Sequence, residues 1–151
     1  MGSLPPDIEP LLSGFNKNPP CASAKLATVE QSFGTAFPVE YQQFMATSNG
    51  GEGSIGAESY LILDPVERLK EYNLDYQVAE NWPGLVLIGS DGGGMGFAFD
   101  VRDPAMPMVA FDFTSISPED RWFVGATFWE FLMRLGRFTC GIDWDNPEEP
   151  G

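Results

Sequence analysis

The chain of 151 residues contains no histidine and only two cysteines, Cys21 and Cys140. Without histidine it has no Ser-His or Cys-His nucleophile pair, no usual zinc ligand set and no imidazole general base. Two cysteines far apart in the chain are too few for a disulfide-built scaffold, and we expect both thiols to be reduced and inert. An enzyme with this sequence would depend on carboxylates, tyrosine, lysine or a bound metal.

Basic residues are also scarce, because 8 lysines and arginines stand against 22 aspartates and glutamates, for a net charge of −14. No basic residue lies between Lys25 and Arg68 or between Lys70 and Arg102, and both intervals contain several carboxylates. Such a surface repels nucleic acid and anionic membranes and attracts a basic protein partner. The simpler interpretation, which the sequence alone favours, is that the charge keeps the protein soluble.

Long hydrophobic runs and targeting signals are absent as well. No apolar run is long enough to cross a bilayer, and the first residues lack the charged and apolar regions of a secretory signal. Pro6 stands where a myristoylation signal needs serine or threonine. A hydrophobic content of 43% with 13% aromatic residues predicts a folded domain with a substantial core. We therefore expect a cytoplasmic domain without membrane attachment.

The most informative motif is the stretch of residues 85–101, in which two apolar runs flank a glycine-rich turn. The turn begins with Asp91, Gly92 and Gly93, and such steps permit the positive φ that tight hairpins need. A phosphate-binding loop would need a Lys-Ser/Thr pair and a following helix, whereas a strand pattern follows here without a nearby lysine. We predict a structural β-hairpin.

Capping signals predict where the helices begin. Ser23 is the expected N-cap of a helix that runs to about residue 33, and Asp64 is the expected N-cap of one that runs to about residue 72. Pro38 is suited to the first turn of a second helix. Thr127 and Glu130 have the spacing of a capping box for the last helix.

Further strands are predicted at residues 60–63, 108–113 and 121–124, and residues 52–59 are expected to form a loop. Consecutive strands joined by tight turns predict a mainly antiparallel sheet, with a mixed sheet as the alternative. The helices would pack against this sheet, which makes the fold class α+β. The expected organisation is a proline-rich N-terminal arm at 1–22, a domain at 23–137 and an acidic C-terminal tail at 138–151.

Four segments of the chain follow one another at a characteristic spacing: VEQSFGTAFPVEYQQFMATSNGG (29–51), LILDPVERL (61–69), GLVLIGSDGGGMGFAFD (84–100) and ATFWEFLMRL (126–135). In this order they resemble the SUKH superfamily, which includes a fungal cell-wall assembly regulator and many bacterial toxin-immunity proteins. The sequence departs from the family pattern at Phe37, where leucine is usual, and at Met95, where an acidic or polar residue is frequent. No single segment is specific, but their order and spacing together are.

The shared residues also have structural explanations, because they begin a helix, end it or turn the hairpin. The resemblance therefore implies a non-catalytic binding module, with no cofactor, no metal and no catalytic residues. The structural motif residues are Pro38, Asn49, Gly50, Gly51, Asp91, Gly92 and Gly93.

The leading hypothesis is an immunity protein that neutralises a bacterial toxin domain by covering its functional surface. If the toxin is a basic nuclease, carboxylates of this chain would occupy the groove that otherwise takes phosphates. An intracellular regulator or scaffold is the alternative within the family, and for each candidate a merely solvated side chain is the alternative. The candidate partner-binding residues are Glu52, Glu58, Glu67, Glu71, Asp75 and Tyr76.

Other interpretations have weaker support. A glycosidase would use two carboxylates from the set Asp91, Asp100, Asp103 and Asp112, although each of these also suits a turn or a strand end. A calcium loop in the tail fails, because Pro147 stands where such a loop needs a ligand. The aromatic residues least obviously assigned to the core, and so candidate interface anchors, are Tyr60, Tyr72, Tyr76, Trp82 and Trp144.

Overall fold

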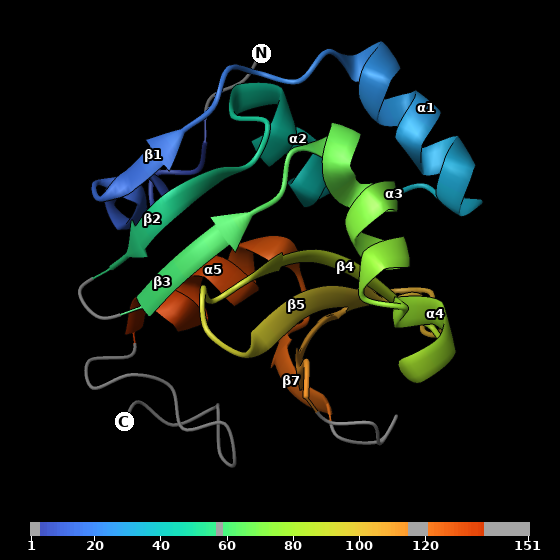
Figure 1. The fold of residues 1–151 in the computed structure, drawn as a ribbon. Helices are drawn as coiled ribbons and strands as arrows, with labels where there is room; N and C mark the ends of the chain where they lie inside the picture. Colours follow the sequence, from blue (N-terminus) through green and yellow to red (C-terminus); the bar gives the residue numbers. More distant parts are fainter. Residues whose placement is uncertain (1–3, 57–58, 115–120, 138–151) are drawn as a thin grey trace.

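The computed structural model describes residues 4–56, 59–114 and 121–137 (Figure 1). A seven-stranded sheet follows the chain order from one edge to the other, and every neighbouring pair of strands is antiparallel. The predicted α+β class is confirmed, and the alternative of a mixed sheet is wrong. The strands are β1 (Phe15–Lys17), β2 (Gly51–Ile55), β3 (Ser59–Leu63), β4 (Leu85–Ser90), β5 (Met95–Asp100), β6 (Met108–Asp112) and β7 (Arg121–Gly125).

Helices pack against the sheet, as predicted. In the described residues they are a 3-10 turn η1 (Glu9–Leu12) and the α-helices α1 (Ser23–Phe33), α2 (Val39–Thr47), α3 (Val66–Asp75), α4 (Val78–Asn81) and α5 (Phe128–Arg137). Helix α5 contacts β2, β3, β7 and α2, and α1 packs on α3. None of these helices has the length and apolar character to cross a membrane.

The core is rich in aromatic rings. On the α5 side of the sheet, Phe97 meets Phe131 with ring centroids 4.9 Å apart, and Phe99 meets Tyr41 of α2 at 5.2 Å. On the opposite side, a second cluster forms around Trp82 and includes residues of α4, β4 and β6. Strands β4 to β6 are therefore buried on both faces.

The predicted hairpin of residues 85–101 is confirmed as β4 and β5. The carboxylate of Asp91 accepts hydrogen bonds from the N–H groups of Gly93 at 2.8 Å and Met95 at 3.2 Å. Gly92 has a φ of +81°, which a glycine adopts without strain. The glycine loop therefore turns a hairpin.

The prediction of a loop at residues 52–59 is wrong, because residues 52–55 belong to β2, which lies between β1 and β3, and Ser59 begins β3. The glycines Gly51 and Gly53 of this strand permit a close approach of β1. A Cβ added to Gly51 would lie 2.6 Å from the carbonyl oxygen of Asn16, and one added to Gly53 would collide with the backbone of β1. Glycine in a strand can indicate that another backbone lies close to it, as well as a turn.

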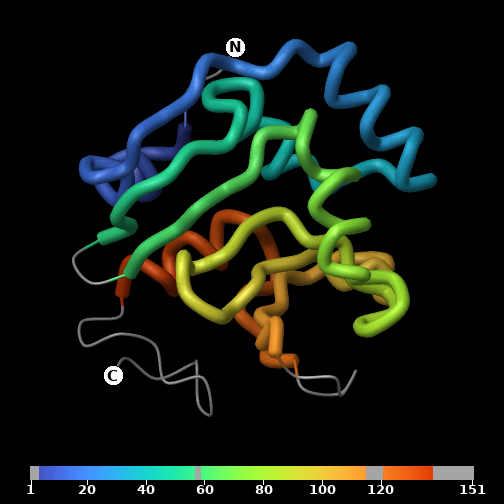
Figure 2. The backbone as a smooth tube through the Cα atoms, in the orientation of Figure 1, coloured from blue at the N-terminus to red at the C-terminus, as the bar shows by residue number. Residues whose placement is uncertain are grey.

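Residues 4–17 contribute to the core. Ile8, Leu12 and Phe15 are buried, and β1 pairs with β2. Figure 2 shows this N-terminal segment alongside β2, and its turn η1 contacts both β2 and α5. The segment expected to be a proline-rich arm thus provides an edge strand, whereas the domain boundary at residue 23 stays a prediction.

Two predicted N-caps are wrong. Ser23 is the first residue of α1, after the N-cap Ala22, and α3 begins after Pro65 and runs on to Asp75. The side chain that reaches the start of α3 is Asn49, whose Oδ1 accepts a hydrogen bond from the N–H of Val66 at 3.0 Å. This cap comes from a residue distant in sequence, so local patterns do not indicate it.

Both side chains of the predicted capping box bond the backbone at the start of α5, but Glu130 accepts from the residue before Thr127 and not from Thr127 itself. The hydroxyl of Thr127 accepts from the N–H of Glu130 at 3.1 Å, and the Glu130 carboxylate accepts from the N–H of Ala126 at 3.0 Å. Glu40 of α2 adds a further acceptor, for the N–H of Trp129 at 2.9 Å. The start of α5 is thereby tied to α2.

Candidate functional site

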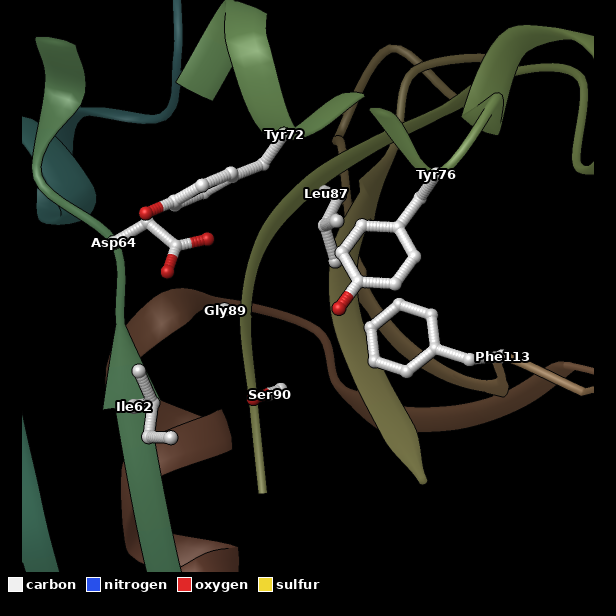
Figure 3. A pocket seen from close by; sticks show the side chains of 8 residues that line it. All are labelled: Ile62, Asp64, Tyr72, Tyr76, Leu87, Gly89, Ser90 and Phe113. Carbon is white, nitrogen blue, oxygen red and sulfur yellow. The ribbon is translucent and has the colours of Figure 1, made fainter. Parts of the chain in front are cut away.

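A groove opens on the outer face of the sheet between β3 and the C-terminal half of α3 (Figure 3). It consists of two cavities of about 310 Å³ and about 420 Å³, which adjoin because Ile62, Asp64 and Tyr72 line both. These volumes lie in the range typical of binding sites. We call it the β3–α3 groove, lined chiefly by the side chains of Glu52, Tyr60, Ile62, Asp64, Tyr72, Tyr76, Ser90 and Phe113.

The groove exists because β3 and β4 pair only briefly. Their register contains only Ile62 with Ser90 and Leu63 with Gly89, and β4 has an irregularity between Leu87 and Gly89. Gly89 is needed at this point, because a Cβ there would collide with the carbonyl oxygen of Ile62. Beyond this short contact the strands separate, and side chains from both line the opening.

Helix α3 is fixed above the groove by Asn73. Its side-chain amide donates to the carbonyl oxygens of Leu69 at 2.7 Å and Leu87 at 2.9 Å, and its Oδ1 accepts from the N–H of Leu87 at 2.9 Å. The side chain thus satisfies the backbone of β4 beside the irregularity. It also places Tyr72 and Tyr76 over the opening.

Asp64 provides a carboxylate in the middle of the groove. It follows β3, and its own N–H donates to the carbonyl oxygen of Ile88 at 2.9 Å. Burial raises the pKa of Asp64 to about 7, because the charged form loses hydration. Within the described ranges, its carboxylate has no hydrogen bond or ion pair.

The two ends of the groove differ in character. At one end the hydroxyl of Tyr60 donates to the Glu52 carboxylate at 2.6 Å, and this hydrogen bond raises the pKa of Tyr60. At the other end the ring of Tyr76 stacks on Phe113, with centroids 4.3 Å apart and an interplanar angle of 19°. The groove therefore joins an acidic, hydroxyl-rich end to an aromatic end, with Asp64 between them (Figure 3).

The predicted partner-binding residues do not all lie in one part of the structure. Glu52 and Tyr76 line the groove, and Asp75 is exposed at the end of α3 without lining either cavity. Glu58 lies outside the described residues. Since no partner is present, their binding roles stay predictions.

The other two candidates, Glu67 and Glu71, lie on α3 outside the groove and have partners of their own. Glu67 accepts from Asn49 at 2.7 Å and pairs with Lys25 at 3.1 Å, and the Asn49 hydrogen bond is the main reason why its pKa is lowered. Glu71 pairs with Arg68 at 2.7 Å.

The sequence did not indicate Asp64, Tyr72 and Phe113 as a group. Asp64 had been assigned to a helix cap, and Tyr72 had been singled out only as a candidate exposed aromatic residue. Trp82, singled out for the same reason, is buried with 2% of its surface exposed, so that expectation is wrong. Trp144 and Cys140 lie outside the described residues, whereas Cys21 is buried.

The four aspartates considered for glycoside hydrolysis serve local structure. Asp100 pairs with Arg102 at 2.9 Å, and the hydrogen bonds from Arg102 lower the pKa of Asp100. The hydroxyl of Thr114 likewise lowers the pKa of Asp112. A general acid needs the opposite shift, and the described residues contain no group of three or more potential metal ligands. The remaining two, Asp91 and Asp103, accept hydrogen bonds from backbone N–H groups of their own turns.

Comparison with known proteins gives one family. The model of the SMI1 / KNR4 family (SUKH-1) matches residues 20–134. The matched stretch runs from just before α1 into α5 and contains every groove-lining residue named above. No curated protein matches the chain.

Proposed function

The chain belongs to the SMI1 / KNR4 family (SUKH-1), and on that premise we propose that it is an immunity protein that neutralises a toxin domain by binding it. The family match supports a binding module of the immunity or regulator kind. The proposal adds that this module covers the functional surface of its partner and does no chemistry of its own. It would act in the cytoplasm, chiefly through the domain proposed at residues 23–137.

The β3–α3 groove is the observation that carries this proposal. It presents the carboxylates of Glu52 and Asp64 beside the rings of Tyr60, Tyr72 and Tyr76. Tyrosine is a frequent anchor at protein interfaces, and carboxylates select basic partners. A nuclease toxin has a basic substrate groove, so the two surfaces would be complementary.

The net charge of −14 supports the same proposal through kinetics. A strongly acidic protein attracts a basic one over a distance, which raises the association rate by about tenfold or more at low salt. An immunity protein benefits because the toxin must be bound before it finds nucleic acid.

The direct test is capture of the toxin domain encoded beside this chain, washed at low and then at high salt. We expect capture at low salt, loss of most of it at high salt, and protection of cells from the toxin. Capture that does not respond to salt would contradict the electrostatic part. If nothing is captured at low salt, the immunity role is wrong, and the regulator role within the same family takes its place.

Matched charge variants locate the binding surface. Replacing Glu52→Gln together with Asp64→Asn removes two carboxylates from the groove, and we expect affinity to fall by about tenfold or more. Replacing Asp7→Asn together with Glu80→Gln removes two carboxylates from exposed positions outside the groove, and we expect a change within about threefold. Equal losses from both pairs would show that only net charge matters.

A further inference from the structure

Asp64 is a carboxylate whose partner is missing from the described part of the chain. Burial raises its pKa to about 7, and no donor or cation among residues 4–56, 59–114 and 121–137 compensates the lost hydration. A carboxylate in a low-dielectric site normally gains charged or hydrogen-bonding partners, because an isolated one is destabilising. A binding partner is one source of this compensation, because the described residues do not supply it.

The surroundings of Asp64 leave room for such a partner. In Figure 3 its carboxylate points into the open centre of the cavity, with Tyr72 beside it and Tyr76 stacked on Phe113 at the opposite wall. Gly89 and Ser90 lie between these walls. The space of about 310 Å³ is thus bounded by a carboxylate and by aromatic faces.

No basic side chain of α3 supplies the missing charge. Arg68 pairs with Glu71 at 2.7 Å, and Lys70 donates to the carbonyl oxygen of Ser32 at 2.9 Å while its Nζ lies 4.5 Å from the Phe33 ring centroid. Neither lines the groove, and no other lysine or arginine in the described residues lines its two cavities. A ligand that complements the charge of the groove would therefore be a cation.

We propose that the β3–α3 groove binds an arginine side chain of the partner, with its guanidinium on the Asp64 carboxylate and its planar face toward Tyr72 or Tyr76. This inference rests on the proposed function and names the group that the partner inserts. Arginine fits because its fork donates two parallel hydrogen bonds to a carboxylate and its face stacks on aromatic rings. Lysine offers neither the fork nor the flat face.

The test uses three blocked tripeptides, acetyl-Gly-Arg-Gly-amide and its citrulline and lysine counterparts, added to the full chain labelled for amide NMR. Citrulline keeps the shape of arginine but has no charge. We expect saturable shifts of the Asp64 and Ser90 amides at millimolar arginine peptide, and binding about tenfold weaker for the other two. Equal binding of lysine or citrulline, or no saturable shift in the groove, would overturn the proposal.

Two variants that change the charge equally test the role of Asp64. Asp64→Asn should weaken the arginine peptide by about tenfold, whereas Glu80→Gln, on an exposed position of α4, should leave it unchanged. The amide spectrum of each variant shows directly whether it is folded. Equal effects of the two changes would assign the binding to net charge and overturn the assignment to Asp64.

The outcome of the peptide experiment is independent of the outcome of the toxin-capture experiment. If the toxin is captured but the arginine peptide does not bind, the groove inference is wrong and the immunity role stands. If the peptide binds in the groove and no toxin is captured, the immunity role is wrong and the arginine site stands, for a partner of another kind.

Discussion

The two halves of the sheet differ in how many faces they bury. In β2 and β3 burial alternates along the strand, so that one face meets the core and the other, with Glu52 and Tyr60, faces out. In β4 and β5 the first five residues of each strand are all buried. One half of the sheet is therefore enclosed on both faces, and the other half leaves one face exposed.

The β3–α3 groove lies at the seam of these halves, where strands with different surroundings meet. The seam is short because β3 and β4 share two residue pairs, and it is closed at Gly89 by direct backbone approach. A groove at such a seam has a rigid base, because the twice-buried strands on one side hold their positions. We infer that the division of the sheet separates stability from recognition.

The largest expected effect is a loss of stability on replacing a core residue of the strands that are buried on both faces. Phe99→Ala removes a ring with no exposed surface that contacts Phe37 and Tyr41 at 5.8 Å and 5.2 Å between centroids. We expect the free energy of unfolding to fall by about 3–5 kcal/mol, because the ring leaves a cavity in a packed core. Urea denaturation followed by tryptophan fluorescence measures the change.

The matched change in the other half is Tyr60→Ala, which removes a ring with 41% of its surface exposed. We expect a change in the free energy of unfolding within about 0.5 kcal/mol, because little apolar surface loses contact. A cost for Tyr60→Ala as large as that of Phe99→Ala would contradict the proposed division of the sheet.

A smaller loss of stability is expected on removing the hydrogen bonds that fix α3 to β4, beside the short contact of β3 and β4. Asn73→Ala removes three hydrogen bonds and leaves the N–H and C=O of Leu87 without their side-chain partner. We expect unfolding to become easier by about 2–3 kcal/mol, because Leu87 lies in the buried half. Denaturation gives the total, and faster amide hydrogen exchange at Leu87 locates it.

Asn81→Ala is the control for this prediction. Asn81 lies on α4, and its side chain makes no hydrogen bond in the described residues. We expect a change within about 0.5 kcal/mol and unaltered exchange at Leu87. If Asn73→Ala were equally mild, the seam would be held by packing instead of by these hydrogen bonds.

The smallest expected effect is a gain in stability, on replacement of Asp64 in the groove. Because burial raises the pKa of Asp64 from 3.8 to about 7, the native state keeps a proton that the unfolded chain releases between these values. The contribution of Asp64 to stability therefore falls as pH rises from about 4 to about 7. Asp64→Asn should be more stable than the natural sequence at pH 8, by about 1–2 kcal/mol.

The stability difference should shrink as the pH is lowered toward 5, because Asp64 is then protonated in the native state. Thermal or urea denaturation of both proteins across this range measures it. A difference independent of pH would contradict the raised pKa. A binding residue that lowers stability is an example of the trade-off between stability and function that is expected at a functional site.

Local patterns predicted a large part of the fold. The hairpin, the start of α5 and the ends of α1 and α2 depend on neighbours in sequence, and α1 ends at the predicted residue 33, followed by Gly34 with a φ of +74°. Strand β2 and the start of α3 were not predicted, because they depend on residues that are far away in the sequence. Gly51 and Gly53 permit the approach of β1, and the cap of α3 comes from Asn49.

The candidate site was predictable only in fragments. Glu52, Tyr60, Tyr72 and Tyr76 were singled out by charge or aromatic character, but nothing in the sequence joined them to Asp64. They line one groove because β3 and β4 separate and α3 crosses above the gap. Phe113 completes the aromatic end from beyond β6.

The sequence by itself determined the composition of the surface and the local turns: the net charge of −14, the lack of histidine, the hairpin and the amphipathic last helix. These follow from residue identity and short-range geometry. Only the tertiary structure decided which carboxylate is partly buried and which aromatic rings lie around it. Burial and cross-strand proximity depend on contacts between residues far apart in the chain, and no local pattern encodes them.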